Sequence, residues 1–130
     1  MRFISTKAHG YFDYIIGAIL IIAPWLLGFA AGGAETIIPV VMGVGIILYS
    51  MFSDHEVSAA RKLSMTSHLS IDLIAGLFLA FSPWLFGFNQ LVWAPHLIVG
   101  ALIFMGGLFT SRVPESCPKG TPCYDYSHSR

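Results

Sequence analysis

Apolar residues fill long stretches of the chain, and charged residues are confined to the ends of those stretches. No Asp, Glu, Lys or Arg lies between Tyr14 and Ala34, between Thr36 and Ser53, or between Leu73 and Ser111. The first two intervals each have about the ~20 residues that a membrane-spanning helix needs, and the third is long enough for two such helices. The pattern therefore predicts four transmembrane helices. We expect them at about residues 7–29, 36–52, 67–88 and 91–110.

The first and third of these stretches carry the same polar and aromatic positions. His, Asp, Gly, Pro, Trp, Gly and Phe recur at one constant offset of 59 residues, so the chain is interpreted as a tandem duplication. The alignment weakens after the Phe, because the turn that follows is three residues shorter in the second copy if Pro39 is matched with Pro95. The recurring positions are His9, Asp13, Gly17, Pro24, Trp25, Gly28 and Phe29 in the first copy, and His68, Asp72, Gly76, Pro83, Trp84, Gly87 and Phe88 in the second.

Composition and charge placement support a membrane protein and predict its orientation. The 130 residues are 55% hydrophobic and only 11% charged, whereas soluble domains carry about 25% charged residues. Every Lys and Arg falls at the N-terminus, between the second and third helices, or in the C-terminal tail, which the positive-inside rule assigns to the cytoplasm. All three Trp residues then lie on the opposite side, as in an interfacial aromatic belt. These expectations describe a multi-pass protein of the bacterial plasma (inner) membrane, with no removable signal peptide.

The paired His and Asp residues are the candidates for chemistry. His9 and Asp13, like His68 and Asp72, are four residues apart and share one helix face. If a pseudo-two-fold axis brings the first and third helices together, the four side chains converge near the cytoplasmic surface. They would then ligate a divalent transition metal or relay protons. The hypothesis favoured by the sequence is instead structural, with the pairs fastening the bundle by hydrogen bonds, because they lie in the first helical turns and do not match His-Glu-x-x-His.

The repeated Pro-Trp-x-x-Gly segment is interpreted as structural. Pro24, Trp25 and Gly28, with their counterparts Pro83, Trp84 and Gly87, fall near the outer face, where a Pro and a Gly end a helix and a Trp anchors it. A discontinuous helix lining a binding site is the alternative.

The remaining motifs are weaker. After Arg112 the composition changes to that of a polar tail, in which Cys117 and Cys123 are expected to be reduced thiols if the tail is cytoplasmic. Ser53-Asp54-His55-Glu56 resembles a capping box and predicts a short surface helix over 57–63. His55 and His96 match nothing across the repeat and receive no role. No phosphate loop, nucleophile motif or basic surface for nucleic acid is present.

Taken with Ser82-Pro83-Trp84, the repeated positions resemble those of the SPW repeat family of small bacterial membrane proteins. The resemblance covers about residues 5–110, and the first copy departs from it by having Ala23 in place of Ser. It implies an architecture but no catalytic residue, because the family has no established activity.

The sequence therefore predicts an all-α, four-transmembrane-helix bundle of two tandem two-helix hairpins, related by a pseudo-two-fold axis along the membrane normal, with both termini cytoplasmic. One membrane domain covers 1–112, with repeat 1 at about 5–53, a linker with the surface helix at 54–66 and repeat 2 at about 67–111; the tail is 113–130. The expected function is that of a small structural, accessory or self-associating membrane protein, not an enzyme. It would need no cofactor and would contact membrane lipid and other membrane proteins or its own copies, with no nucleic acid. The alternative is a metal-binding or proton- or ion-translocating protein that uses the paired His and Asp.

Overall fold

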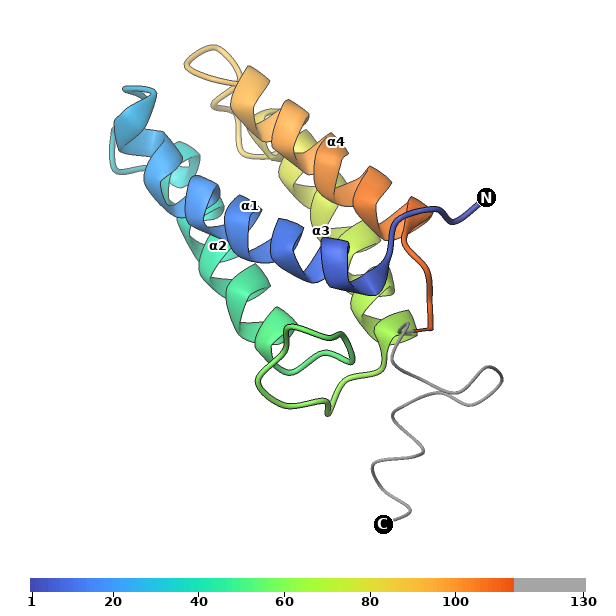
Figure 1. Cartoon of the computed structure of the whole chain (residues 1–130). Helices are drawn as coiled ribbons and strands as arrows, with labels where there is room; N and C mark the ends of the chain where they lie inside the picture. Colours follow the sequence, from blue (N-terminus) through green and yellow to red (C-terminus); the bar gives the residue numbers. More distant parts are fainter. Residues whose placement is uncertain (114–130) are drawn as a thin grey trace.

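The protein is a bundle of four helices, described here from a computed structural model that defines residues 1–113. Helix α1 (Thr6–Leu26) packs along α2 (Ala34–Met51), and α3 (Met65–Leu85) packs along α4 (Ala94–Phe109). Figure 1 shows the two hairpins side by side, and α2 also contacts α3. We call the end that holds the N-terminus, the 52–64 connection and the end of α4 the termini end. The other end, with the turns at 27–33 and 86–93, is the hairpin end.

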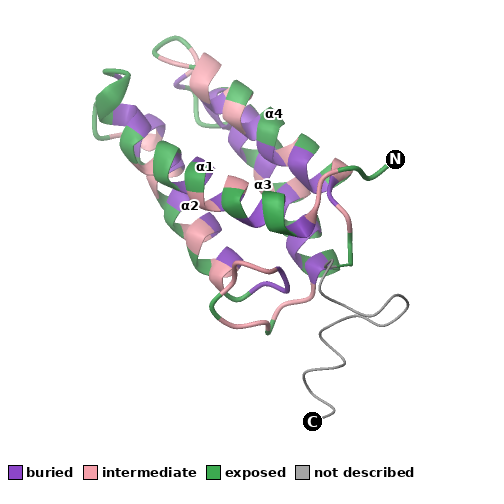
Figure 2. Cartoon of the chain, in the orientation of Figure 1, coloured by how far each residue is buried: buried purple, intermediate pink, exposed green. Residues whose placement is uncertain are grey.

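The exterior of the bundle is apolar and its interior contains the polar groups. Large apolar side chains such as Ile15, Val44, Ile74 and Ile98 are exposed on all four helices, whereas every Asp, Glu and His of the four helices is buried. Figure 2 shows the exposed residues on the outer faces of the helices. Three helices are long and apolar enough to cross a membrane, and α4 is a shorter apolar helix of 16 residues, about 24 Å long. This arrangement is that of a bundle whose outer surface contacts lipid.

The repeated Pro-Trp-x-x-Gly-Phe segment ends a helix in both copies. The N–H of Phe29 donates to the carbonyl of Pro24 at 2.9 Å, and that of Phe88 donates to the carbonyl of Pro83 at 2.9 Å. Gly28 has φ +73° in the first copy, the left-handed conformation of a Schellman motif. Because Gly adopts this conformation without strain, the segment terminates the helix at the hairpin end.

Close helix contact within each hairpin is made by one pair of glycines. A Cβ added to Gly43 would lie 2.5 Å from the carbonyl oxygen of Gly17, and one added to Gly100 would lie 2.6 Å from that of Gly76. The two pairs occupy equivalent places in the two repeats. A Cβ on Gly45, in contrast, would meet nothing within 4 Å, so this glycine makes no close helix contact within the described residues.

The predicted surface helix over 57–63 is absent. The backbone N–H groups of this stretch hydrogen-bond to the last turn of α2: those of Ala59 and Ala60 to the carbonyl of Met51, and those of Lys62 and Leu63 to that of Phe52. These bonds satisfy carbonyls that the end of α2 leaves free, so they replace the bonds of a local helix. The connection therefore folds back under the bundle, with Ser53, Asp54 and His55 buried.

Candidate functional site

The site lies at the termini end, between the two repeats, and consists of His9 and Asp13 from α1 with His68 and Asp72 from α3. All four residues are buried, and one nitrogen or oxygen atom of each lies within 4.8 Å of the others. Each helix is started by a serine, Ser5 or Ser64, whose Oγ accepts a backbone N–H at 3.2 Å. Because the caps stand four residues before the histidines, both histidines occupy the same place in the first turn of their helices.

The closest contacts join one repeat to the other. Nε2 of His9 lies 2.9 Å from Oδ2 of Asp72, and Nε2 of His68 lies 3.0 Å from Oδ2 of Asp13. The contacts within each helix are longer, at 3.4 Å for His9 with Asp13 and 3.3 Å for His68 with Asp72. The two Nε2 atoms are 3.2 Å apart. The i, i+4 spacing in the sequence thus puts the His and Asp of each helix on one face. Each His, however, makes its closest contact with the Asp of the other repeat.

A hydroxyl group fixes the orientation of each imidazole. Thr110 Oγ1 donates to the carbonyl of Gly106 at 2.7 Å and lies 2.9 Å from Nδ1 of His9. Ser53 Oγ donates to the carbonyl of Tyr49 at 2.7 Å and lies 2.6 Å from Nδ1 of His68. Since each hydroxyl has one proton and uses it on a carbonyl, it accepts from the imidazole, and Nδ1 carries the proton in both rings. A neutral His9 and a neutral His68 therefore both present the Nε2 lone pair to the centre of the site.

The carboxylates also have hydroxyl partners. Ser50 Oγ donates to Oδ2 of Asp13 at 2.9 Å, and the hydroxyl of Tyr49 donates to Oδ1 of Asp72. Ser50 Oγ in turn lies 3.0 Å from Nε2 of His55 and accepts a hydrogen bond from the N–H at this position. Burial lowers the pKa of His55, which favours a neutral ring in the 52–64 connection. Each of the four site residues is thus hydrogen-bonded to its own hydroxyl side chain, which is not itself one of the four.

Several of these hydrogen-bond partners could not be predicted by comparing the two sequence repeats. Tyr49 and Ser50 match Gly106 and Gly107 in repeat 2, and His55 matches no histidine there. Ser53 and Thr110 are counterparts, 57 residues apart, but their hydroxyls become recognisable as equivalent only when both are seen to hold a histidine of the other repeat.

The Pro-Trp segment is remote from this site. Pro24 is eleven positions after Asp13 in α1, which is about 16 Å along the helix. At the hairpin end, the buried His96 lies between the rings of Phe29 and Phe88, with centroid distances of 5.5 and 5.0 Å. The structure thus places all six Pro-Trp-x-x-Gly residues at the hairpin end, away from the site formed by His9, Asp13, His68 and Asp72. They are Pro24, Trp25, Gly28, Pro83, Trp84 and Gly87. Cys117 and Cys123 lie outside the described residues.

Four apolar helices, an apolar exterior and a buried polar centre between two repeats define a helical integral membrane protein. The family model described as SPW repeat domain matches residues 7–110. The chain therefore belongs to the SPW repeat family. No curated protein and no solved structure matches it.

Proposed function

We propose that this membrane protein binds one divalent transition-metal ion, of the zinc type, between its two repeats, and that the ion has a structural role. The observation that carries the proposal is the direction of the two histidines. Both Nδ1 atoms are bonded to hydroxyls, and both Nε2 atoms face the same point together with two carboxylates. Imidazole nitrogens and carboxylate oxygens are common zinc ligands, and hydrogen-bonded outer partners are typical of such sites.

The separations between the ligand atoms fit a tetrahedral ion. Bonds of about 2.0–2.1 Å place the corners of a regular tetrahedron about 3.3–3.4 Å apart. The two Nε2 atoms are 3.2 Å apart, and they lie 2.9 and 3.3 Å from Oδ2 of Asp72. The two histidines face different oxygens of Asp13: Nε2 of His68 lies 3.0 Å from Oδ2, and Nε2 of His9 lies 3.4 Å from Oδ1. The four ligand atoms all lie within 4.8 Å of one another, so an ion at the centre requires the widest-spaced ligands to move closer together.

Protonation of the histidines, without a metal ion, balances the charges of these four residues less well than a divalent ion does. Two imidazolium rings would each donate to a carboxylate of the other repeat, but their Nε2 atoms, 3.2 Å apart, would place two positive charges next to each other. Two neutral rings would leave two lone pairs and two buried carboxylates facing one another, with only the hydroxyls of Ser50 and Tyr49 to stabilise the negative charge, and burying a charge is costly. One divalent ion uses all four ligand atoms and cancels both negative charges.

The structural role is supported by the number of ligands and by the packing around the site. Four protein ligands fill a tetrahedral ion and leave no open position, a property of structural sites and not of catalytic ones. Proton or ion translocation has less support, because a core of apolar side chains lies on the hairpin side of the site and offers a moving ion no ligands. This core comprises Ile16, Leu20, Ile46, Leu79 and Ile103.

The orientation with the site at the cytoplasmic face of a bacterial inner membrane, and association with other membrane proteins or further copies, are parts of the same proposal.

Metal analysis of the purified protein tests the proposal. The background is a full-length chain with Cys117→Ser and Cys123→Ser and no histidine tag, so that thiols and the tag contribute no metal. We expect about one zinc-type ion per chain after equilibration, and an X-ray absorption spectrum with a first shell of nitrogen and oxygen near 2.0 Å. The double variant Asp13→Asn/Asp72→Asn should lose the ion.

The matched control is Glu35→Gln, which changes a buried carboxylate of α2 at the hairpin end. Its side chain accepts N–H groups of Ala31 and Gly33 and belongs to no histidine cluster. This variant should retain the ion. A folded wild-type protein that takes up no metal, or an Asp13→Asn/Asp72→Asn protein that binds as much as the control, contradicts the proposal.

A further inference from the structure

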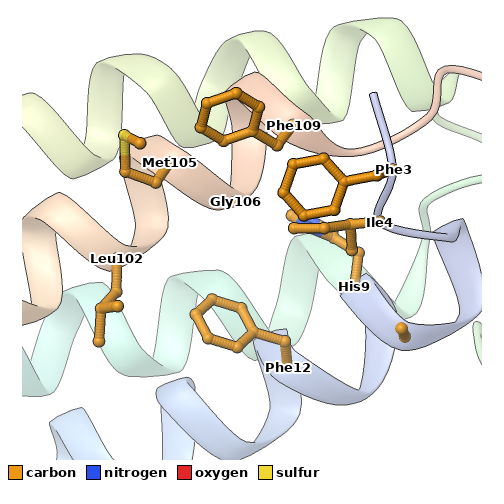
Figure 3. A pocket seen from close by; sticks show the side chains of 9 residues that line it. Phe3, Ile4, His9, Phe12, Leu102, Met105, Gly106 and Phe109 are labelled. Carbon is orange, nitrogen blue, oxygen red and sulfur yellow. The ribbon is translucent and has the colours of Figure 1, made fainter. Parts of the chain in front are cut away.

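A pocket of about 490 Å³ lies beside the His and Asp site, on the side where α4 meets α1. In Figure 3 side chains from the N-terminal segment, from α1 and from α4 surround one space. The lining is almost wholly apolar and includes three phenylalanine rings, with His9 as its ionisable member, and the ring of Phe3 stacks on that of Phe109 at 5.4 Å. The lining includes Phe3, His9, Phe12, Met105, Gly106 and Phe109.

The pseudo-two-fold axis relates this pocket to an equivalent place beside His68, and there a tyrosine ring fills the space. On the side where α2 meets α3, the ring of Tyr49 packs against His68 with centroids 4.8 Å apart, and its hydroxyl donates to Asp72. The backbone carbonyl of Tyr49 accepts from Ser53, as that of Gly106 accepts from Thr110. Tyr49 and Gly106 are therefore equivalent positions, 57 residues apart.

Gly106 leaves the counterpart of the tyrosine ring unfilled in repeat 2. A Cβ at this position would point at the ring of His9, with Cε1 at 3.5 Å and Nδ1 at 3.6 Å, and would also meet Phe12 at 3.6 Å. These are ordinary contact distances, so the backbone allows a side chain there. The pocket thus occupies the space next to His9 that a phenol occupies next to His68.

We propose that the pocket binds a small membrane-soluble phenol or hydroquinone, whose ring lies on His9. Asp13 is not among the residues that line the pocket, and the pseudo-two-fold relationship to Tyr49 and Asp72 directs the hydroxyl past His9 to this carboxylate. The volume lies within the usual range for small-molecule pockets, and phenylalanine and methionine side chains make favourable contacts with an aromatic ring. A purely aliphatic occupant gains nothing from a carboxylate, whereas an aromatic hydroxyl can donate to it. The proposal depends on the pocket and on Tyr49, and not on an ion in the site.

Binding of p-cresol, which is the tyrosine side chain as a free molecule, tests this inference against toluene, which lacks only the hydroxyl. Both are titrated against the full-length protein in nanodiscs and followed by NMR. We expect saturable binding of p-cresol, about tenfold tighter than that of toluene, because a hydrogen bond to a charged acceptor distinguishes the two. Intermolecular NOEs should connect p-cresol with Gly106 and Phe12.

Gly106→Leu fills the pocket without supplying a hydroxyl and should abolish saturable binding. Gly45→Leu is the matched control, since Gly45 faces open space on α2, and it should bind p-cresol as the wild type does. Equal affinity for p-cresol and toluene, or equal binding by the two leucine variants, would overturn the proposal. If Gly106→Leu does not fold, the NOEs in the wild-type protein decide: contacts to Gly106 and Phe12 support the proposal, and their absence in a saturated sample refutes it.

Discussion

Thr110 and His9 are 101 residues apart in the sequence, yet Thr110 Oγ1 lies 2.9 Å from Nδ1 of His9. The same relationship joins Ser53 to His68 in the other repeat. The hydroxyl that ends each hairpin thus sets the tautomer of the histidine that begins the other one. This exchange ties the two repeats together at the termini end.

Removing these hydroxyls should weaken the metal site without removing a ligand. Thr110→Val leaves the shape of the side chain and deletes the acceptor for the Nδ1 proton of His9. Loss of an outer hydrogen-bond partner typically costs 10–100-fold in metal affinity, so we expect a decrease of about that size, and the same for Ser53→Ala. Competition with a chelator of known affinity measures the effect. Ser70→Ala, at an exposed serine of α3, is the control, and unchanged affinity in Thr110→Val would show that the hydroxyl does not orient the ligand.

Tyr49→Phe tests the outer partner of a carboxylate. The substitution keeps the ring that packs on His68 and removes the hydroxyl that donates to Asp72. We expect metal affinity to fall by about tenfold or more, with little change in the apolar packing. Chelator competition gives the affinity, and Tyr11→Phe, at an exposed tyrosine of α1, should match the wild type. Equal affinities in the two variants would contradict this role of Tyr49.

The glycine contacts predict a stability difference within α2. Gly43→Ala places a methyl group 2.5 Å from the carbonyl of Gly17, so the helices must separate, and overpacking of this kind costs about 1–3 kcal/mol. Gly100→Ala should have the same effect in repeat 2. Gly45→Ala adds the same methyl group in open space and should leave stability unchanged or slightly raised. Reversible unfolding in mixed micelles gives the free energies, and a Gly43→Ala protein as stable as Gly45→Ala would argue against close packing at this crossing.

The proposed orientation can be tested with single cysteines in a Cys117→Ser/Cys123→Ser background. Ala31→Cys is in the exposed turn at the hairpin end, and Lys62→Cys is exposed in the 52–64 connection at the termini end. If the Lys and Arg residues face the cytoplasm, a membrane-impermeant thiol reagent added to intact cells labels the first and not the second. Both should react after the cells are permeabilised. The reverse pattern in intact cells would invert the orientation and place the metal site at the outer face.

Much of the fold was predictable because it depends on local rules. The absence of charge over helix-length intervals predicts the four spans, and the constant offset between the repeats predicts two equivalent hairpins. The boundaries were predicted less well: α4 begins at Ala94 and not near Leu91, with a proline in its first turn, and α3 begins at Met65 because Ser64 caps it. The surface helix over 57–63 was wrong because capping-box residues describe local preference, whereas the N–H groups of this stretch bond to the end of α2.

The sequence by itself determined the chemistry available, namely two histidines and two aspartates at the same place in two equivalent helices. It could show that each pair shares a helix face, because the spacing of four residues is a property of one helix. Only the tertiary structure decided that His9 meets Asp72 and that His68 meets Asp13, at 2.9 and 3.0 Å, since these contacts depend on how the hairpins approach each other. It also decided the direction of the Nε2 atoms, which the hydroxyls of Ser53 and Thr110 impose from the opposite repeat. The physical reason is that a helix fixes the order of its side chains, while their partners are set by packing between segments distant in the chain.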